Sequence, residues 1–410
     1  MHLLTNSYFP DPMGIAPLAD DLATQLRRLG HEVSVVTTFP YYPDWRVPAK
    51  YRGKWLSVED REGVTVYRSY VFVRARATVA VKALFYASFT LSSIFNVIRS
   101  GRPDAVLVMS PPPTLVMSAW IWKVLHGARI VLDVQDIVPD AAISFGMMTN
   151  TLEIRFFRFV ERLAYRLADS IVVVAESFVP NLVGKGVPRQ KLSVIHNWVD
   201  TTLMRPLAPT GRVRHPLGLS DSDFVVMYAG NMGASQGLEM VLQAAKLLED
   251  AESIHFVFIG GGTMAASLRD QAGQLELRRV HFLPAFPFSE MSEIQADADV
   301  GLVIQKANVL DVNLPSKIPV IMACGRPIIA AVNPSGDAYR ILEDSQAAIL
   351  VTTGDATALA DAVKDLAGDT GRADRMGEWG RAYAVDHFSQ PSSVAAYVRI
   401  LDNVVEAKPA

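Results

Sequence analysis

The chain has 410 residues, of which half are apolar and 20% are charged, a composition that excludes a disordered or fibrous protein. Its single cysteine, Cys324, excludes a disulfide framework and a cysteine-based zinc site and is typical of a reducing compartment. The net charge of −3 divides into +5 over residues 1–200 and −8 over residues 201–410, so the first half favours an anionic partner. A chain of this length exceeds one ordinary core, and two domains are expected.

Short runs rich in β-branched residues alternate with helical patterns along the first half. Strands are expected over 2–5, 33–37, 105–109, 129–134 and 170–174, and helices over 16–29, 83–98, 114–126 and 151–167. The alternation restarts after Pro206, with strands over 224–228, 255–259, 280–283, 300–304 and 327–331 and helices over 237–248, 264–275, 288–296 and 316–323. Two such series predict an α/β protein of two Rossmann-like, doubly wound domains with parallel sheets.

The boundary between the domains is expected near residue 200. Pro206, Pro209, Gly211 and Pro216 interrupt regular structure, so 197–216 is expected to be a linker. We predict an N-terminal domain over 1–200 and a C-terminal domain over 201–389. Residues 390–410 carry one more amphipathic helix, and the residue pattern leaves open which domain it joins.

Residues 79–98 form a largely apolar segment that is long enough to span a membrane. Lys82 and several Ser and Thr residues dilute it, and the stretch 63–103 holds six basic residues and no acid. Three interpretations stay open: a buried or half-buried helix of the domain, a helix lying in a membrane interface, or, with the smallest weight, a true span. Basic residues interleaved with apolar ones favour an anionic membrane surface over nucleic acid as the partner. Since the N-terminus lacks a signal-peptide pattern, we expect a cytoplasmic protein bound peripherally at the inner face of the cell membrane.

Glycine-rich loops follow two expected strands of the second half, at 229–237 and 260–262. Parallel sheets bind ligands at the carboxyl ends of their strands, and glycines let backbone N–H groups approach an anion. A plain turn with a helix cap is the alternative for either loop alone. Lys317 begins a third helix, where it opposes the helix dipole unless it neutralises a phosphate. The donor-side candidates are Gly230, Asn231, Gly233, Gln236, Gly261, Ser316 and Lys317.

Two loops of the first half are further candidates. Gly14 ends the loop after the first strand, where a ligand could approach the backbone, and Gln135 and Asp136 follow a later strand. A solvated loop acid is an equally weighted alternative for Asp136. The sequence has no Walker motif, no Gly-x-Gly-x-x-Gly, no His-Glu-x-x-His and no nucleophile elbow. These missing motifs weigh against an ATPase, a dehydrogenase, a metalloprotease and an α/β-hydrolase.

As an ordered set, the motifs resemble those of the family-4 glycosyltransferases of GT-B fold, in the bacterial surface-polysaccharide branch that includes a colanic-acid biosynthesis transferase. The matching stretches lie at 26–37, 110–113, 134–140, 195–200, 228–239 and 314–328 and cover nearly the whole chain in the family's order. The resemblance implies two Rossmann-like domains facing across a cleft, with a nucleotide-sugar held by the C-terminal one. It also implies that the helix in 390–410 crosses back to the first domain.

The resemblance implies retaining transfer of a sugar from a nucleotide-sugar, UDP- in preference to GDP-, to a polyprenyl-diphosphate-linked saccharide, with no metal or other cofactor required. The product would be a cell-surface polysaccharide such as O-antigen, capsule or exopolysaccharide. Ser316, Lys317 and the backbone of Gly230–Gly233 would stabilise the leaving diphosphate. Asp136, beside Gln135, is the candidate that orients the acceptor, and no side chain is assigned as a base.

The sequence departs from the family pattern at positions that matter for chemistry. Asn231 and Gln236 stand where the family commonly has an Arg and a Lys, and Gln135 stands where it often has a histidine. Val312 and Val320 occupy the places of its paired glutamates. A second class therefore stays open, a catalytically weakened GT-B protein that acts as a binding or partner subunit. A phosphorylase or epimerase is disfavoured, since an epimerase would be expected to place acids and a histidine around the sugar.

Overall fold

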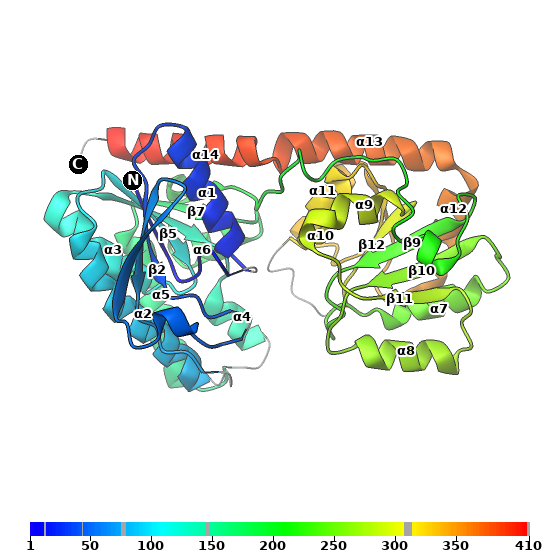
Figure 1. Cartoon of the computed structure of the whole chain (residues 1–410), viewed down its shortest axis with the longest axis horizontal. Helices are drawn as coiled ribbons and strands as arrows, with labels where there is room; N and C mark the ends of the chain where they lie inside the picture. Colours follow the sequence, from blue (N-terminus) through cyan, green and yellow to red (C-terminus); the bar gives the residue numbers. More distant parts are fainter. Residues whose placement is uncertain (12–13, 43, 75–78, 145–147, 307–313, 408–410) are drawn as a thin grey trace. The chain divides into compact units, whose positions relative to one another are not determined.

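The computed structural model describes residues 1–11, 14–42, 44–74, 79–144, 148–306 and 314–407 (Figure 1). The chain forms two compact units, each built on one sheet. The first unit is Met1–Asn197 together with Ser393–Ala410, and the second is Trp198–Ser392. The predicted class, two α/β domains with largely parallel sheets, is confirmed.

The sheet of the first unit has the strand order β3-β4-β2-β1-β5-β6-β7-β8. The strands are β1 (His2–Thr5), β2 (Ser34–Thr38), β3 (Leu56–Arg61), β4 (Val64–Ser69), β5 (Ala105–Ser110), β6 (Arg129–Val134), β7 (Ser170–Val173) and β8 (Leu192–Val194). All neighbours are parallel except β3 and β4, an antiparallel hairpin at the edge that the sequence analysis missed. Its turn is Glu62-Gly63, both with positive φ (51° and 79°), as a two-residue turn of this hand requires.

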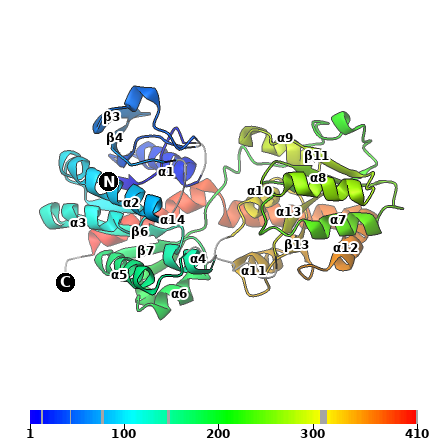
Figure 2. The same cartoon turned by 90° about the horizontal axis from the view of Figure 1, so that it is seen from below.

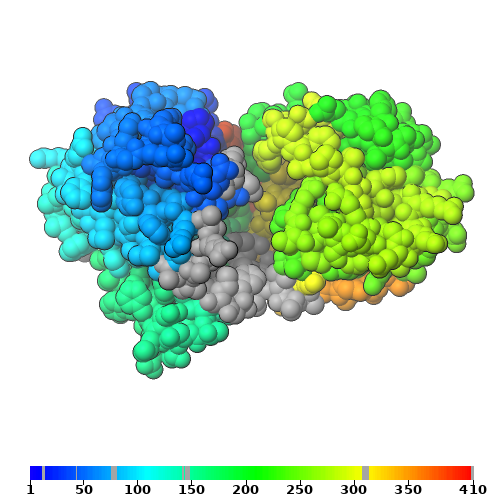
Figure 3. Space-filling view, turned by 60° about the horizontal axis from the view of Figure 1, so that its bottom comes forward, coloured from blue at the N-terminus to red at the C-terminus, as the bar shows by residue number. Residues whose placement is uncertain are grey.

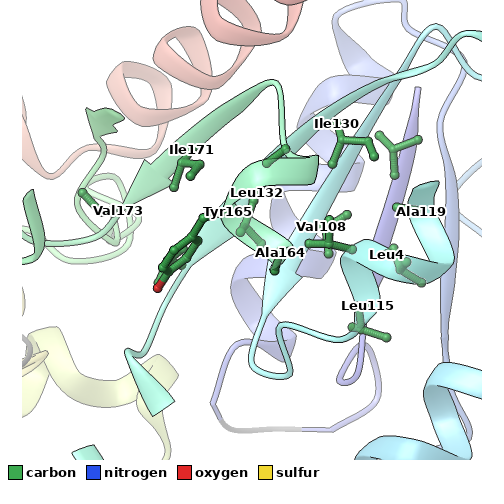
Figure 4. Packing of buried hydrophobic residues seen from close by; sticks show 14 of the residues in the cluster. Leu4, Val108, Leu115, Ala119, Ile130, Leu132, Ala164, Tyr165, Ile171 and Val173 are labelled. Carbon is green, nitrogen blue, oxygen red and sulfur yellow. The ribbon is translucent and has the colours of Figure 1, made fainter. Parts of the chain in front are cut away.

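Helices cover this sheet and close its core. They are α1 (Ala16–Arg28), α2 (Val79–Arg99), α3 (Leu115–His126), α4 (Val138–Ser144), α5 (Thr151–Leu167), α6 (Phe178–Gly184) and the end of α14 (Gln390–Glu406). Figure 4 shows Val108 and Leu132 of the sheet beside Leu115 of α3 and Ala164 of α5. Both faces of a parallel sheet are buried in this way, so its strands are apolar without alternation.

The segment expected at 79–98 is α2, which is half-buried in the first unit. By length and composition alone, Val81–Arg99 is the one helix among the described residues that could cross a membrane, with a mean hydropathy of 1.4. Its inner face is bonded to the unit, because the Asn96 amide donates to the carbonyl of Arg68 at 2.9 Å and the Ser92 hydroxyl donates to that of Tyr70 at 2.5 Å. In this structure, α2 is therefore a packed helix of the domain with one exposed face.

The sheet of the second unit is wholly parallel, in the order β11-β10-β9-β12-β13-β14. Its strands are β9 (Phe224–Ala229), β10 (Ile254–Ile259), β11 (Val280–Leu283), β12 (Val300–Ile304), β13 (Ile328–Ala331) and β14 (Ala348–Leu350). Its helices are α7 (Glu239–Leu247), α8 (Ala265–Gln274), α9 (Met291–Ala296), α10 (Lys317–Ala323), α11 (Asp337–Asp344), α12 (Ala356–Gly368) and α13 (Thr370–His387). Because all strands run the same way, the loops after β9 and β10 emerge at one edge.

The expected linker at 197–216 is instead packed with the second unit over most of its length. The carboxylate of Asp297, fully buried, accepts hydrogen bonds from the backbone N–H groups of Thr210 (2.7 Å), Gly211 (2.9 Å) and Val213 (2.7 Å). The prolines prevent regular structure, so these backbone N–H groups have no partner in a helix or strand. The buried Asp297 carboxylate accepts their hydrogen bonds instead. The chain passes between the units at Asn197–Trp198 and again inside α14, at Ser392–Ser393.

Candidate functional site

The loops that follow β9 and β10 are bonded to each other at the carboxyl edge of the second sheet. The N–H of Gly230 donates to the carbonyl of Ile259 at 2.9 Å, and that of Met232 donates to the carbonyl of Gly261 at 2.7 Å. The N–H of Met264 returns to the carbonyl of Met232 at 2.9 Å. Backbone hydrogen bonds therefore hold the two glycine loops together.

Two glycines are required by this close approach. A Cβ atom at Gly260 would lie 2.2 Å from the carbonyl oxygen of Gly230, and one at Gly262 would lie 2.6 Å from Oδ1 of Asn231. Both residues also have positive φ, 129° and 142°, which favours glycine. Gly261, the predicted site glycine, has open space around its Cβ position.

Lys317 points its ammonium at these loops from the start of α10. Its Nζ lies 3.8 Å from the centroid of the Tyr228 ring, and a Cβ at Gly230 would be 3.5 Å from the same atom. The stem of Lys317 is partly exposed, but Nζ is buried and has no hydrogen-bond partner among the described residues. Burial lowers the pKa of this amine to about 7. A buried cation without an anion is unfavourable, and a bound anion would complete the arrangement.

Tyr228, the next-to-last residue of β9, organises the donor-side loop and was missed by the sequence analysis. Its hydroxyl donates to the carbonyl of Asn231 at 2.7 Å and lies 3.3 Å from Oε1 of Gln236. Burial raises the pKa of this phenol, so it stays a neutral donor. The Asn231 amide in turn lies 3.1 Å from the Cβ position of Gly233. The structure thus brings together predicted residues at 230–236 with Lys317.

The remaining donor-side positions are placed differently. Ser316 precedes α10 as an exposed residue whose side chain makes no cap hydrogen bond. Val320, in place of a family glutamate, is buried on the same helix, and Val312 lies outside the described residues. Among the described residues, no group of three or more His, Cys, Asp or Glu side chains is placed to hold a metal ion.

In the first unit, Gln135 follows β6 and is buried with its amide engaged. Its Nε2 donates to both carboxylate oxygens of Asp133, at 3.1 and 2.9 Å, and its Oε1 accepts from Nδ2 of Asn197 at 2.9 Å. Tyr397 of α14 donates its hydroxyl to the same carboxylate at 3.1 Å. Asp133 is fully buried, and desolvation raises its pKa to about 7. Gln135 therefore links this carboxyl group to Asn197, the last residue before the crossing.

Asp136, in contrast, is exposed beside a hollow lined with aromatic rings. Its charge adds to burial in raising the pKa of Tyr86 to about 12. The hollow, about 90 Å³, is lined by Asn6, Tyr41, Trp45, Phe72, Arg74, Val81, Lys82, Phe85 and Tyr86. Asp11 supports its wall, since the carboxylate accepts the N–H groups of Tyr41 and Tyr42 at 3.2 Å each.

Gly14, the other predicted residue of this unit, is exposed just before α1. It has a φ of 66° and open space at its Cβ position. Gly14 is not among the residues that line the hollow. The aromatic lining was missed by the sequence analysis, because Tyr41 and Trp45 lie in an irregular segment whose neighbours only the fold defines.

The fold has two doubly wound α/β units, and the second has paired glycine loops and a buried lysine at the carboxyl edge of its sheet. Parallel sheets bind ligands at this edge. Residues 13–198 match the family described as Glycosyl transferase 4-like domain, and residues 223–369 match Glycosyl transferases group 1. Each half of the chain therefore carries a glycosyltransferase domain, and the chain is a glycosyltransferase.

Known proteins agree with this assignment. The chain is 29% identical over 326 residues to a protein of Escherichia coli K12 named as colanic acid biosynthesis glycosyl transferase WcaI, covering 78% of this chain and 80% of that protein. Sucrose-phosphate synthase of Thermosynechococcus elongatus superposes with a TM-score of 0.75 at 15% identity, covering 98% of this chain and 99% of that chain. HepE of Anabaena in complex with UDP gives a TM-score of 0.73 at 17% identity, covering 98% of this chain and 100% of that chain. The predicted GT-B fold and enzyme class are confirmed.

Proposed function

We propose that the protein transfers a sugar, with retention of configuration, from a nucleotide-sugar to a polyprenyl-diphosphate-linked saccharide in cell-surface polysaccharide synthesis at the cytoplasmic face of the membrane. The proposal that the protein binds a nucleotide-sugar rests on the buried, unpartnered ammonium of Lys317 beside the paired glycine loops. A UDP-sugar is favoured because the Anabaena protein was solved with UDP. The polysaccharide role is supported by the name of the Escherichia coli relative.

The chemistry asked of the donor side is stabilisation of a leaving diphosphate. The acceptor hydroxyl attacks the anomeric carbon, the bond from that carbon to the phosphate oxygen breaks, and the hydroxyl proton passes to the leaving phosphate. Charge accumulates on the diphosphate, where the Lys317 ammonium would lie together with loop N–H groups other than those of Gly230 and Met232, which already donate to Ile259 and Gly261. Because the pKa of Lys317 is about 7, the bound anion would hold it protonated at neutral pH.

Asp136 is the proposed orienting group for the acceptor. It is exposed beside the aromatic hollow, whose lining includes Trp45 and Tyr86, side chains that can pack against a sugar. Gln135 would contribute as a positioning residue, since its amide is occupied by Asp133 and Asn197. No metal or other cofactor takes part in this scheme.

The test is release of nucleotide with a polyprenyl-diphosphate-linked saccharide and a panel of UDP- and GDP-sugars. Release that requires both substrates supports the proposal, and loss of release in Lys317→Ala with weaker donor binding supports the assignment of the lysine. Donor binding unchanged in that variant would contradict the assignment.

A second candidate, a binding or partner subunit of weak activity, is favoured by one observation. Val320 places a buried apolar side chain where the family has an acid. Saturable donor binding without nucleotide release for any substrate pair would support this alternative and contradict the transferase.

A further inference from the structure

Large apolar side chains are exposed on three adjoining helices of the first unit. They are Leu84, Leu91, Phe95 and Ile98 of α2, Trp120, Val124 and Leu125 of α3, and Leu152, Phe156 and Phe159 of α5, each at least 45% exposed. Helix α3 packs against both α2 and α5, so their outward sides adjoin (Figures 2 and 3). We call this surface the three-helix face. Ten large apolar side chains exposed on helices that pack together point to an interaction site, whereas single exposed apolar residues are ordinary.

Helix α5 places a row of arginines beside its exposed apolar stripe. Leu152, Phe156 and Phe159 recur at helical spacing. The neighbouring stripe consists of exposed Arg155, Arg158, Arg162 and Arg166. Of the two acids of α5, Glu161 is buried and accepts from Lys185 at 2.9 Å, and Glu153 is exposed in the first turn. Arg158 lies 4.0 Å from Asp140, so the positive charge of the row comes from Arg155, Arg162 and Arg166. A helix with an apolar stripe flanked by arginines is typical of one that lies in a membrane interface.

Helix α2 adds to the positive charge of the face. It carries exposed Arg99 and no acid, and Arg102 follows it, whereas Lys82, two positions before Leu84, lies on the opposite side of the helix and lines the hollow. Arg68, counted among the basic residues of 63–103 in the sequence, does not contribute, because it is buried and bound to Glu59 at 2.7 Å. The exposed basic residues are therefore not concentrated in residues 63–103, as the sequence indicated, and are densest on α5.

We propose that the three-helix face is the docking surface of this protein for an anionic phospholipid bilayer, with α2, α3 and α5 lying along the surface. The apolar side chains enter the boundary between headgroups and acyl chains, and the arginines bind lipid phosphates. This inference rests on the proposed function, since a lipid-linked acceptor resides in that bilayer. It adds the surface and the lipid charge that the bound enzyme requires.

Charge favours a bilayer over a second copy of the chain as the occupant. In a two-fold dimer the same surface meets itself, and the arginine row would then face like charge. A bilayer with anionic headgroups offers the opposite charge over the whole face. The hydrogen bonds of Asn96 and Ser92 hold α2 to the unit, which argues against its leaving the domain to span the bilayer.

The hollow on the acceptor side lies at the N-terminal turns of α2, on the side of this helix away from Leu84 and Leu91. Val81, Lys82, Phe85 and Tyr86, at the start of α2, line the aromatic hollow beside Asp136. Because only this helix separates the hollow from the face, docking through α2 would bring the hollow within one helix diameter, ~10 Å, of the headgroups that hold the diphosphate of a lipid-linked acceptor. Arg74 and Lys82 at the hollow have the charge to receive it.

The test is flotation of the full chain with phosphatidylglycerol/phosphatidylcholine vesicles and with phosphatidylcholine vesicles, without substrates. We expect binding to the anionic vesicles that weakens as salt rises. Each basic residue near an anionic surface contributes about fivefold to partitioning, so R155Q/R162Q/R166Q should lower it on the order of a hundredfold. K364Q/R372Q/R375Q, which removes the same charge from exposed sites of the second unit, should bind as wild type.

A second pair of variants tests the apolar part. F156S/F159S should weaken binding to anionic vesicles with unchanged circular dichroism and thermal midpoint, since both side chains are already exposed. L247S, an exposed leucine of the second unit, is the matched control and should bind normally.

Several outcomes would overturn the proposal. These are equal binding to neutral and anionic vesicles, normal binding by both the arginine and the phenylalanine variants, and retention through high salt and alkaline extraction, which would indicate a span. A dimer in solution that F156S/F159S dissociates would assign the face to self-association. Activity on a short-chain, water-soluble acceptor without vesicle binding would overturn this inference alone. Vesicle binding without activity on any acceptor would overturn the proposed function alone.

Discussion

Lys317 places the demands of binding and of folding in opposition. An unfolded lysine has a pKa of about 10.4, whereas burial lowers that of Lys317 to about 7. Between these values the unfolded chain binds more protons, so stability rises with pH across this window and is reduced below it. A group kept at this cost without a partner in the protein indicates a ligand that supplies the opposite charge.

Lys317→Met should therefore stabilise the free protein while it weakens the donor. Methionine keeps the contact with the Tyr228 ring and removes the buried charge, which should raise the free energy of unfolding at pH 7 by a few kcal/mol, about 4 at most. Donor affinity should fall about 10- to 100-fold. Thermal unfolding and calorimetry measure the two effects, with Lys246→Met on the exposed face of α7 as control. A destabilised Lys317→Met would show that the amine has an anionic partner within the protein.

Asp133 should make stability depend on pH in the opposite direction. Its pKa is raised from about 3.9 in the unfolded chain to about 7, so the native state binds more protons between these values. The stabilisation is present below pH 4 and is lost as pH rises through about 7.

The comparison with Asp133→Asn isolates this contribution. We expect the difference in free energy of unfolding between wild type and variant to shift in favour of the variant as pH rises from 5 to 8, by a few kcal/mol at most. Urea unfolding across that range measures it. A difference that does not change with pH would mean that Asp133 keeps one protonation state throughout.

The sequence predicts those parts of the candidate site that depend on position along a strand. Gly230 and Lys317 are predicted because ligands bind where parallel strands end, and the structure places the two residues beside each other. Tyr228 and Asp133 were not found, because each lies within a strand and its role comes from partners distant in sequence, such as Tyr397. Their residue types alone give no signal.

At the scale of elements, the two glycine loops pack closely where Gly260 meets the carbonyl of Gly230, and replacing Gly260 by alanine tests this contact. In Gly260→Ala the new Cβ would meet the Gly230 carbonyl at 2.2 Å and sit at a φ of 129°. We expect a loss of stability of about 1–3 kcal/mol or more, together with weaker donor binding, because the paired loops must separate.

Gly261→Ala is the matched control for stability. Its Cβ position has no atom within 4 Å, so thermal unfolding should change little. Equal destabilisation of the two variants would mean that the loops lose stability through chain flexibility and not through the contact.

Elements with strong local patterns were predicted well, and those defined by distant partners were not. Helix α5 and strand β9 lie where periodicity placed them. The hairpin β3–β4 was missed because Leu56–Arg61 is a half-exposed edge strand with three charged residues. The stretch 206–216 has the composition of a linker, but Asp297, nearly ninety positions away, fixes it to the second unit.

For the whole molecule, chain connectivity makes the two units unequal as folding units. The second unit is one continuous stretch, Trp198–Ser392, whereas the first is completed by Ser393–Ala410 from the other end of the chain. Val394, Tyr397 and Leu401 of α14 are buried in the first unit, and Tyr397 bonds the buried Asp133. The first unit should therefore need the part of α14 that follows residue 392 in order to fold.

Three fragments test this dependence. A fragment of residues 198–392 should unfold cooperatively on its own. Residues 1–197 alone should not, because removing α14 exposes a part of the core and leaves Asp133 short of a donor, each costing about 1–5 kcal/mol. Residues 1–197 joined to 393–407 by a short glycine-serine linker should recover cooperative unfolding, since the Ser393 hydroxyl lies 3.5 Å from the carbonyl of His196 at the junction. The same fusion with residues 393–407 in scrambled order is the control, and urea unfolding followed by circular dichroism is the measurement. If residues 1–197 alone unfold with the same midpoint as the intact fusion, α14 is not a structural part of the first unit.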